Sequence, residues 1–387
     1  YRQRFRSGAA YTKGTFSAGL SLSIYDYDGI STHDAKRSST RPIGLRHAFL
    51  QWRSSFGLWR LGATESKWGL GLVAGGRSAM PSATHDFALH TPSDTSAGLT
   101  YGIKVGKLTA ALSGSAVVED DNANLWLGDR GYQGVLALRY APHKPNWFGV
   151  YSAYRSQTDA DGSTLTALAI DLAGAFRGAL GAADAWRFAF EGAALTGSTN
   201  RMLSESAFAQ ERDAMELASF GGAAVLGFDL MNRRLAIDLE GGYASADRNP
   251  EDEQLNRFTF DRNYSVGMIL IPGLLRHTAE ASVLNASDPS RSAQPPRGIE
   301  RLKTEGRVAG VAYFNPRVSL RSGRSKHPSG VHLGLLLAGL PDGSADPYMS
   351  FRRGTPTNPF GGSAGQWLGY EANLGLTQSI KLQRRYA

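Results

Sequence analysis

The feature of this chain that most constrains its fold is an alternation of apolar with polar or small residues, repeated from one end to the other. In the stretch 234–244, one face of an extended strand carries Leu235, Ile237, Leu239 and Tyr243, and the other carries Arg234, Asp238 and Glu240. About sixteen such segments follow one another, with almost no helical pattern to cover them. Strands that are apolar outside and polar inside are typical of membrane-spanning β-barrels. The sequence therefore predicts an all-β fold, a closed antiparallel barrel of about 16 strands (roughly 14–18).

Composition agrees with this prediction. The chain has 387 residues and a mean hydropathy of −0.28, and its apolar runs fall far short of the ~20 residues that a transmembrane helix needs. A soluble chain of this length usually divides into about two or three domains. No linker or shift in composition is visible, so residues 1–387 are expected to form a single barrel domain. The strand-like pattern begins directly at Tyr1–Arg4 with no visible signal peptide, and the chain is taken to be mature or trimmed.

The alternation predicts where the strands lie. We expect them at 1–12, 15–28, 42–54, 58–68, 97–104, 107–119, 131–142, 147–158, 164–178, 185–197, 216–231, 234–246, 258–271, 306–321, 330–340 and 366–382. Residues 272–304 are expected to be irregular, with a short helix around 273–284. Short hairpin turns such as Lys13-Gly14 alternate with long polar loops, which predicts short periplasmic turns and long extracellular loops. The stretch 69–96 is long, rich in glycine and weakly charged, and it is the loop expected to fold into the lumen.

The net charge of +8 raises the question of a nucleic-acid partner, which the distribution of the arginines argues against. They alternate with apolar residues along the strands, as expected for a water-filled lumen. The residues expected to line a pore are Arg2, Arg4, Arg6, Arg60, Arg139, Arg155, Arg177, Arg187, Arg234, Arg317 and Arg321, with Glu191, Asp238, Glu240 and Glu371 on the same face. Arg46 and Asp171 belong to the same pattern.

Other kinds of site fit the sequence poorly. His85, Asp86 and His90 match no common metal spacing, and no Gly-x-Ser-x-Gly elbow points to a hydrolase. Residues Gly69–Gly76 lack the Lys-Ser/Thr of a phosphate-binding loop. We therefore expect no enzyme activity, no metal and no cofactor.

Two stretches carry a family resemblance. Residues 57–76, GLWRLGATESKWGLGLVAGG, resemble the strand-to-inner-loop passage of outer-membrane barrels from predatory and social proteobacteria. Residues 258–271, FTFDRNYSVGMILI, resemble a segment of alginate-export porins. Ala63 stands where that group often has Arg, and the chain lacks an aromatic-terminated last strand. The resemblance implies a passive channel of about sixteen to eighteen strands in the bacterial outer membrane, for an anionic polysaccharide.

Two functions remain open at this stage. A ring of arginines would favour passage of a polar, anionic solute or polysaccharide through a channel. A lumen filled by paired charges would instead give a non-conducting barrel that anchors or partners a larger envelope assembly. We expect a net positive lumen, with Arg2, Arg4 and Arg6 as its most concentrated basic strip, because the neighbouring strand brings inward only Ser17, Ser21, Ser23 and Tyr25. The expected partners are outer-membrane lipid, an anionic solute and other envelope proteins.

Overall fold

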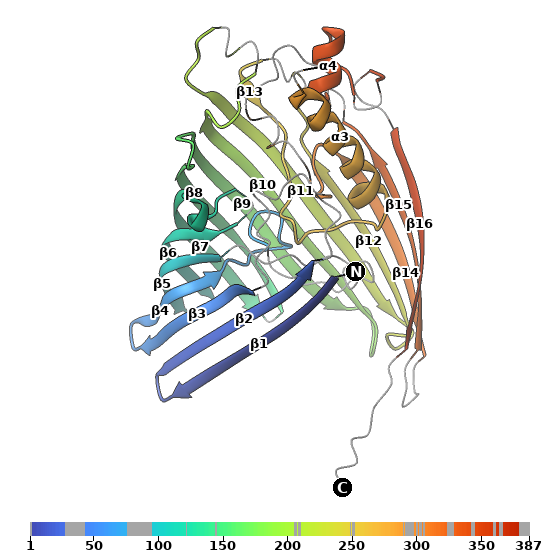
Figure 1. Cartoon of the computed structure of the whole chain (residues 1–387). Helices are drawn as coiled ribbons and strands as arrows, with labels where there is room; N and C mark the ends of the chain where they lie inside the picture. The colour runs from blue at the N-terminus through green and yellow to red at the C-terminus, as the bar shows by residue number, and fades with distance from the viewer. Residues whose placement is uncertain are drawn as a thin grey trace.

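A computed structural model shows one large curved sheet that surrounds several loop segments (Figure 1). It describes residues 2–378, except 28–42, 76–94, 121, 144, 205–206, 208–209, 248, 250–251, 289, 291–297, 299–300, 302–303, 305, 323–328, 342–344, 359–360 and 364–366. Over these residues the sheet has 16 strands, and all but β13 follow one another in chain order as antiparallel neighbours. The all-β, antiparallel architecture predicted from the alternation is confirmed.

The strands lie close to their predicted positions. They are β1 (Arg2–Lys13), β2 (Phe16–Tyr27), β3 (Ile43–Ser54), β4 (Gly57–Glu65), β5 (Thr95–Val105), β6 (Leu108–Glu119), β7 (Arg130–His143), β8 (Asn146–Thr158), β9 (Thr164–Ala179), β10 (Ala185–Thr199), β11 (Met215–Leu230), β12 (Leu235–Ala244), β13 (Gln254–Leu255), β14 (Ala312–Arg321), β15 (Ser329–Gly339) and β16 (Trp367–Gln378). The two-residue strand β13 pairs in parallel with β11. Short helices η1 (Leu125–Leu127), η2 (Leu270–Leu275), α3 (Arg276–Ser287) and α4 (Pro347–Arg353) complete the chain, and η2 and α3 confirm the helix expected around 273–284.

The outer face of the sheet is apolar and exposed. Leu50, Leu376 and Tyr370 expose 63%, 74% and 72% of their surface, and similar residues recur at every second position along the strands. So many large apolar side chains on the convex face indicate contact with lipid, because their exposure to water would be unfavourable. No helix in the described part of the chain is long and apolar enough to cross a membrane.

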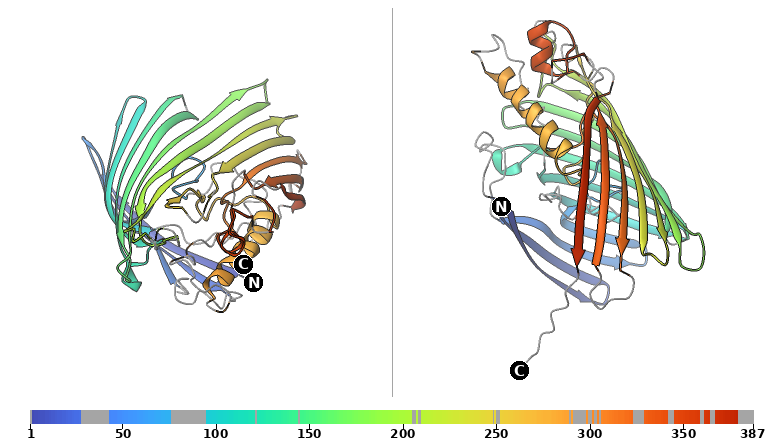
Figure 2. Two further views of the ribbon diagram at one scale, coloured as in Figure 1. Left: turned by 90° about the horizontal axis from the view of Figure 1, so that it is seen from above. Right: turned by 90° about the vertical axis from the view of Figure 1, so that its right-hand side faces the viewer.

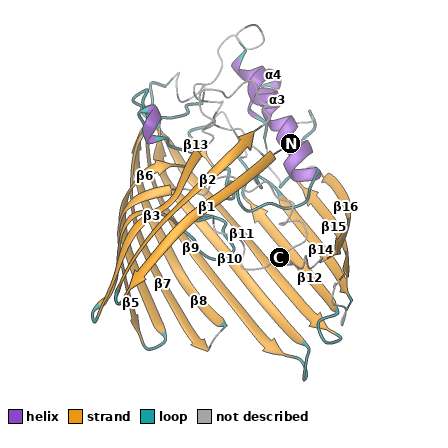
Figure 3. Cartoon of the chain, turned by 60° about the horizontal axis from the view of Figure 1, so that its bottom comes forward, coloured by secondary structure: helices purple, strands orange, loops and turns teal. Residues whose placement is uncertain are grey.

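The connections between strands sort by length onto the two ends of the sheet. One end, the short-turn rim, carries tight turns; Gly14 and Gly106 adopt φ angles of 59° and 58° in two of them. The other end, the long-loop rim, carries the longer segments between β4 and β5, β10 and β11, and β12 and β14, together with α3 and α4 (Figure 3). This arrangement follows from an antiparallel meander, in which successive connections alternate between ends.

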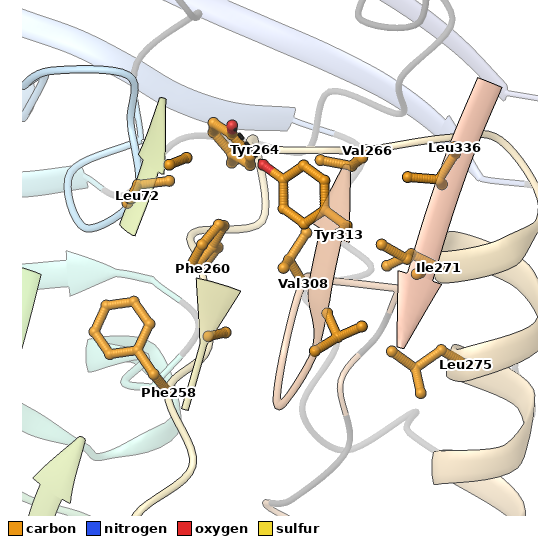
Figure 4. Close-up of a cluster of buried hydrophobic side chains, with 14 of the residues drawn as sticks. Leu72, Phe258, Phe260, Tyr264, Val266, Ile271, Leu275, Val308, Tyr313 and Leu336 are labelled. Atoms are coloured by element: carbon orange, nitrogen blue, oxygen red, sulfur yellow. Dashed lines mark hydrogen bonds between the residues drawn. The ribbon is translucent and has the colours of Figure 1, made fainter. Parts of the chain in front are cut away.

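Two segments from the long-loop rim fold back against the concave face of the sheet, into the space called the lumen here (Figure 2). The first lumenal segment is 66–75 and the second is 256–275. Phe258, Phe260 and Tyr264 of the second segment pack with Leu72 of the first and with Tyr313 of β14 in a hydrophobic core inside the sheet (Figure 4). The part of the lumen next to β10–β15 is therefore filled.

The strand expected at 258–271 is wrong. Its Phe258 and Phe260 alternate as lipid-facing residues would, but both are buried inside the sheet. A Cβ atom built at Gly221 of β11 would lie 2.5 Å from the Phe258 ring and 2.9 Å from the Phe260 ring. The inner face of β11 is thus hollowed by small residues that accommodate these two rings.

The prediction of a closed sheet is also wrong for the described residues, in which β1 and β16 do not pair. The physical reason is the fate of the segment 258–271, which was expected in the wall and lies in the lumen. The described part of the chain holds an odd number of long antiparallel strands, so its two edge strands run in the same direction. An antiparallel closure, as in bacterial barrels with an even number of strands, is impossible between them.

Candidate functional site: an arginine-lined cavity in the lumen

The first lumenal segment is held against the wall by two buried acidic side chains. The side chain of Glu191 on β10 accepts hydrogen bonds from the backbone N–H groups of Gly71 and Leu72, at 2.7 and 2.9 Å. Asp171 on β9 accepts one from the indole N–H of Trp68 at 3.1 Å. A Cβ atom at Gly69 would lie 2.3 Å from a Glu191 oxygen, so only glycine allows this approach. Residues 69–75 therefore lie in the lumen, as expected for this loop; residues 76–94, which include His85, Asp86 and His90, lie outside the described part of the chain.

The second lumenal segment is held in the same way. Glu371 on β16 accepts hydrogen bonds from three consecutive backbone N–H groups, of Met268, Ile269 and Leu270, at 2.7, 2.9 and 2.6 Å. Hydrogen bonds from backbone N–H groups to a carboxylate are stronger than those to a neutral acceptor, because the carboxylate is charged. The edge strand β16 is thus tied to the start of η2.

Hydroxyl groups tie the middle of the second segment to the wall. The Tyr264 hydroxyl donates to Glu240 of β12 at 2.8 Å and lies 2.8 Å from the hydroxyl of Tyr313. Asp261 links the two lumenal segments, since it accepts a hydrogen bond from the N–H of Gly75 at 3.1 Å. The two segments and the wall therefore form one connected network.

A cavity of about 420 Å³ remains between the lumenal segments and the inner face of β5–β11. Its lining extends from strand ends at the long-loop rim, such as Thr199, to Tyr151 and Ala169. Its charged lining residues in the described structure are the arginines Arg155, Arg201, Arg257, Arg301 and Arg307 and the aspartates Asp120, Asp247 and Asp261. Among the residues that line the cavity, five arginines therefore stand against three carboxylates.

Arg155 and Asp120 form an ion pair at the edge of this cavity. The guanidinium of Arg155 also donates to the side-chain oxygen of Gln157, at 2.9 and 2.6 Å. Burial raises the pKa of Asp120, but the charge and hydrogen bond of Arg155, together with hydrogen bonds from the backbone N–H groups of Asn122 and Ala123, hold that pKa below its usual value. Asp120 is therefore ionised and neutralises Arg155.

Asp159, just beyond the end of β8, joins two further arginines. Its carboxylate pairs with Arg201 at 2.9 Å and with Arg301 of the segment between α3 and β14. Arg301 also lies 3.1 Å from Asp161. Burial raises the pKa of Asp159, yet the hydrogen bond from Gln157 and the charges of Arg201 and Arg301 hold it below its usual value. One carboxylate thus fixes two guanidinium groups at the long-loop end of the cavity.

On the side of the second lumenal segment, the charge of Arg257 is less fully compensated, because its neighbour Asp247 is only partly ionised near neutral pH. Burial, together with the charge of Asp252, raises the pKa of Asp247 to about 6, against a smaller opposing effect of Arg257. Burial lowers the pKa of Arg257 to about 10. Around neutral pH Arg257 stays charged, whereas Asp247 titrates close to the physiological range.

Several residues predicted from the sequence lie on the inner face outside the cavity. Arg60 on β4 donates to Gln51 at 3.0 and 2.5 Å and lies over the ring of Phe49. Arg139 on β7 lies over the ring of Trp147, 4.4 Å from its centroid. These contacts hold two guanidinium groups with neutral partners.

Other predicted residues form ion pairs toward the short-turn rim. Arg187 pairs with Asp229 at 2.7 Å and with Asp238, and Arg177 lies 3.6 Å from Asp229. Nearer the middle of the wall, Arg317 of β14 pairs with Glu240 of β12. The inner face therefore combines a paired ladder on β9–β14 with the arginine-rich cavity above it.

The remaining predicted arginines do not join these groups. Arg234 was expected to line the pore, but it lies exposed in the turn before β12. Arg321 is exposed at the last position of β14. The side chains of Arg2, Arg4, Arg6 and Arg46 lie outside the described part of the structure, although the register pairs Arg4 with Tyr25 and Arg6 with Ser23. The basic strip expected on β1 stays a prediction.

The sequence pattern missed most of the arginines around the cavity. Arg201, Arg257, Arg301 and Arg307 follow strands or lie in long connections, where alternation gives no information about direction. Only Arg155 lies inside a strand and was predicted. The available signal was the small-residue character of the inner face of β10–β12, which indicates that some other segment packs there.

No family model matches the chain, and no curated protein matches it. Among solved structures, the outer-membrane channel DcaP of Acinetobacter baumannii is similar over 97% of this chain and 84% of its own length, with 11% identity and a TM-score of 0.48. OprD of Pseudomonas aeruginosa shares 13% identity over 91% of this chain and 74% of its own, with a TM-score of 0.44. An anion-selective porin from Comamonas acidovorans shares 11% identity over 97% of this chain and 88% of its own length, with a TM-score of 0.40.

These TM-scores all lie below 0.5, so the function proposed below depends on the geometry of the chain itself. That geometry defines the class. An antiparallel meander with an exposed apolar outer face, a charged inner face and two distinct rims is the architecture of an outer-membrane β-barrel protein.

Proposed function

We propose that this protein is a passive channel of the bacterial outer membrane for a small anionic solute, formed by residues 1–387 as one domain and without enzymatic activity. The observation that carries the proposal is the excess of arginines over carboxylates around the lumenal cavity. A guanidinium group presents several donors in a fixed plane, which suits carboxylate and related anions. In a narrow passage these charges favour anions over cations.

We place the long-loop rim outside the cell and the short-turn rim in the periplasm, as is general for bacterial barrels. The arginine-lined cavity then lies toward the exterior. A solute would meet Arg201 and Arg301 first and Arg155 deeper in the lumen. The arginines with neutral partners, Arg60 and Arg139, extend the basic character of the inner wall beyond the cavity.

The size of the cavity favours a small solute over a polymer. A cavity of about 420 Å³ is in the usual range for small-molecule sites. Export of an anionic polysaccharide, implied by the family resemblance, would require the two tethered lumenal segments to move away from the wall. Polysaccharide export therefore remains the less favoured form of the channel hypothesis.

The proposal is tested by the reversal potential of the pure protein in a planar bilayer under a salt gradient. We expect anion selectivity, and a smaller selectivity in the Arg155→Gln and Arg257→Gln variants. Arg212→Gln is the matched control, because Arg212 pairs with Glu253 and does not line the cavity. Cation selectivity of the parent, or equal effects of all three substitutions, would contradict the proposal.

One observation favours a second function. The hydrophobic core on the side of β10–β15 fills that part of the lumen with packed side chains, as expected for a barrel that anchors an envelope assembly and conducts nothing. The absence of single-channel current from protein that is fully folded by circular dichroism would support this alternative.

A further inference from the structure

The lining of the cavity is divided into an apolar floor and a basic border, and this division limits the chemistry of the solute. The floor is the inner face of β9–β11. It carries Leu165, Ala167 and Ala169 of β9, Leu195 of β10 and Leu217 of β11, all of which line the cavity.

The strand register shows that these floor residues form one continuous surface. Ala169 is the cross-strand partner of Leu195, and Gly197 of β10 is the partner of both Ala167 and Leu217. Directly paired residues of antiparallel strands project from the same face of the sheet and lie next to one another. The floor is therefore a contiguous patch of mostly leucine and alanine side chains, with the hydroxyl of Ser219 on β11 beside Leu195.

The lumenal segments add apolar surface from another direction. Leu72 and Val73 of the first segment and Phe258 of the second line the same cavity, and Leu72 and Phe258 are almost fully buried. A molecule in the cavity would thus be in contact with apolar side chains from the wall and from the lumenal segments.

The basic border adjoins this floor. Arg155 of β8 is the cross-strand partner of Ala167, and Arg201 follows the end of β10, two residues beyond Thr199, which also lines the cavity. Charged donors therefore lie at the margin of the apolar patch, and the middle of the patch has none. A ligand that satisfies both regions has an anionic group at one end and an apolar body at the other.

We infer that the cavity binds a carboxylate with a compact apolar body, such as an aromatic acid or a short alkanoic acid, in preference to a hydrophilic sugar acid. This inference rests on the proposed anion channel and narrows its substrate class. Hydroxyl groups pressed against leucine and alanine lose their hydrogen bonds to water without replacement, which is unfavourable. Apolar carbons in the same place gain from burial.

The test is equilibrium binding to the full chain in detergent micelles by isothermal titration calorimetry, which needs no current. The probes are benzoate, hexanoate and glucuronate. Benzoate or hexanoate should bind about tenfold more tightly than glucuronate, because several apolar carbons become buried. The comparison of benzoate with hexanoate shows whether a flat ring or a chain is preferred. Equal or tighter binding of glucuronate would overturn the inference.

Two substitutions separate the floor from the border. Leu195→Ser should weaken benzoate and hexanoate by about fivefold to tenfold and leave glucuronate unchanged, whereas Arg155→Gln should weaken all three acids. Val225→Ser is the control for partition into the micelle and for folding, because Val225 is a buried inner-face residue of β11 outside the cavity. An unchanged affinity for the apolar acids in Leu195→Ser, with Val225→Ser also unchanged, would refute the apolar floor.

The outcome is distinguishable from failure of the channel itself. A protein that conducts anions selectively but binds glucuronate best keeps the proposed function and loses this inference. A protein that shows no current but prefers benzoate, with the predicted effect of Leu195→Ser, loses the channel and keeps the binding site.

Discussion

Glu191 offers the sharpest test of how the lumen is organised. Its carboxylate is almost fully buried, with 2% of its surface exposed, and accepts the N–H groups of Gly71 and Leu72. The substitution Glu191→Gln keeps the shape of the side chain but changes one acceptor oxygen into a donor. That donor group would then face a backbone N–H group that also donates, so one hydrogen bond is lost and a repulsive contact replaces it.

The expected magnitude follows from the value of a hydrogen bond to a charged group. Such a bond contributes about 1.5–3 kcal/mol, and burial prevents water from replacing it. Loss of one bond and weakening of the other should cost about 3 kcal/mol of local stability. Local opening of residues 69–75 should become roughly 100-fold more frequent.

Hydrogen exchange of the full-length protein, followed by mass spectrometry on peptides that span 66–75, measures this change. Exchange should accelerate by roughly two orders of magnitude in that peptide. Glu216→Gln is the matched control, because Glu216 is exposed at the start of β11. Unchanged protection of this peptide in Glu191→Gln would refute the tethering of the first lumenal segment by this carboxylate.

Three further predictions follow from the described charges. Glu371→Gln should speed hydrogen exchange in a peptide that spans 268–270, because three N–H groups lose a charged acceptor. Because the pKa of Asp159 is lowered in the folded protein, its ionised form stabilises the fold at pH values above the ordinary carboxyl pKa. This stability is lost as the pH falls through the lowered pKa. The thermal unfolding temperature should therefore fall between about pH 5 and pH 2, and this part of the pH dependence should be absent in Asp159→Asn. Asp247, with a pKa of about 6, should be neutral below pH 6, so anion selectivity in a planar bilayer should rise as the pH falls through 6 in the parent and stay constant in Asp247→Asn.

The wall of the protein could be predicted from the sequence because each strand carries its own evidence. Lipid contact demands apolar residues at every second position, and Tyr132, Leu136, Leu138 and Tyr140 of β7 are exposed as that rule requires. Turns such as that at Gly14 mark the ends of strands. Local information of this kind needs no knowledge of the rest of the fold.

The lumenal segments could not be predicted by the same rule. Phe258 and Phe260 have the spacing of lipid-facing residues, yet they lie in a buried core. An alternating pattern indicates that a side chain contacts an apolar surface, but it does not indicate whether that surface is lipid or protein. The missing information lies far away in the sequence, in the small residues Gly221 and Ala223 that make room for the rings.

The effect of the wall carboxylates on the lumen depends on what they bind, and their number alone does not decide it. A count of charges on the inner face suggests that Glu191 and Glu371 cancel nearby arginines. Both accept hydrogen bonds from backbone N–H groups of the lumenal segments, and neither lines the arginine-rich cavity. The carboxylates that hold the lumenal segments are thereby separated from the cavity, whose own carboxylates are fewer than its arginines. If the protein conducts as proposed, the segments narrow the passage next to a lining in which arginines outnumber carboxylates, and these two conditions together favour electrostatic selection over the ~8 Å screening length of physiological salt.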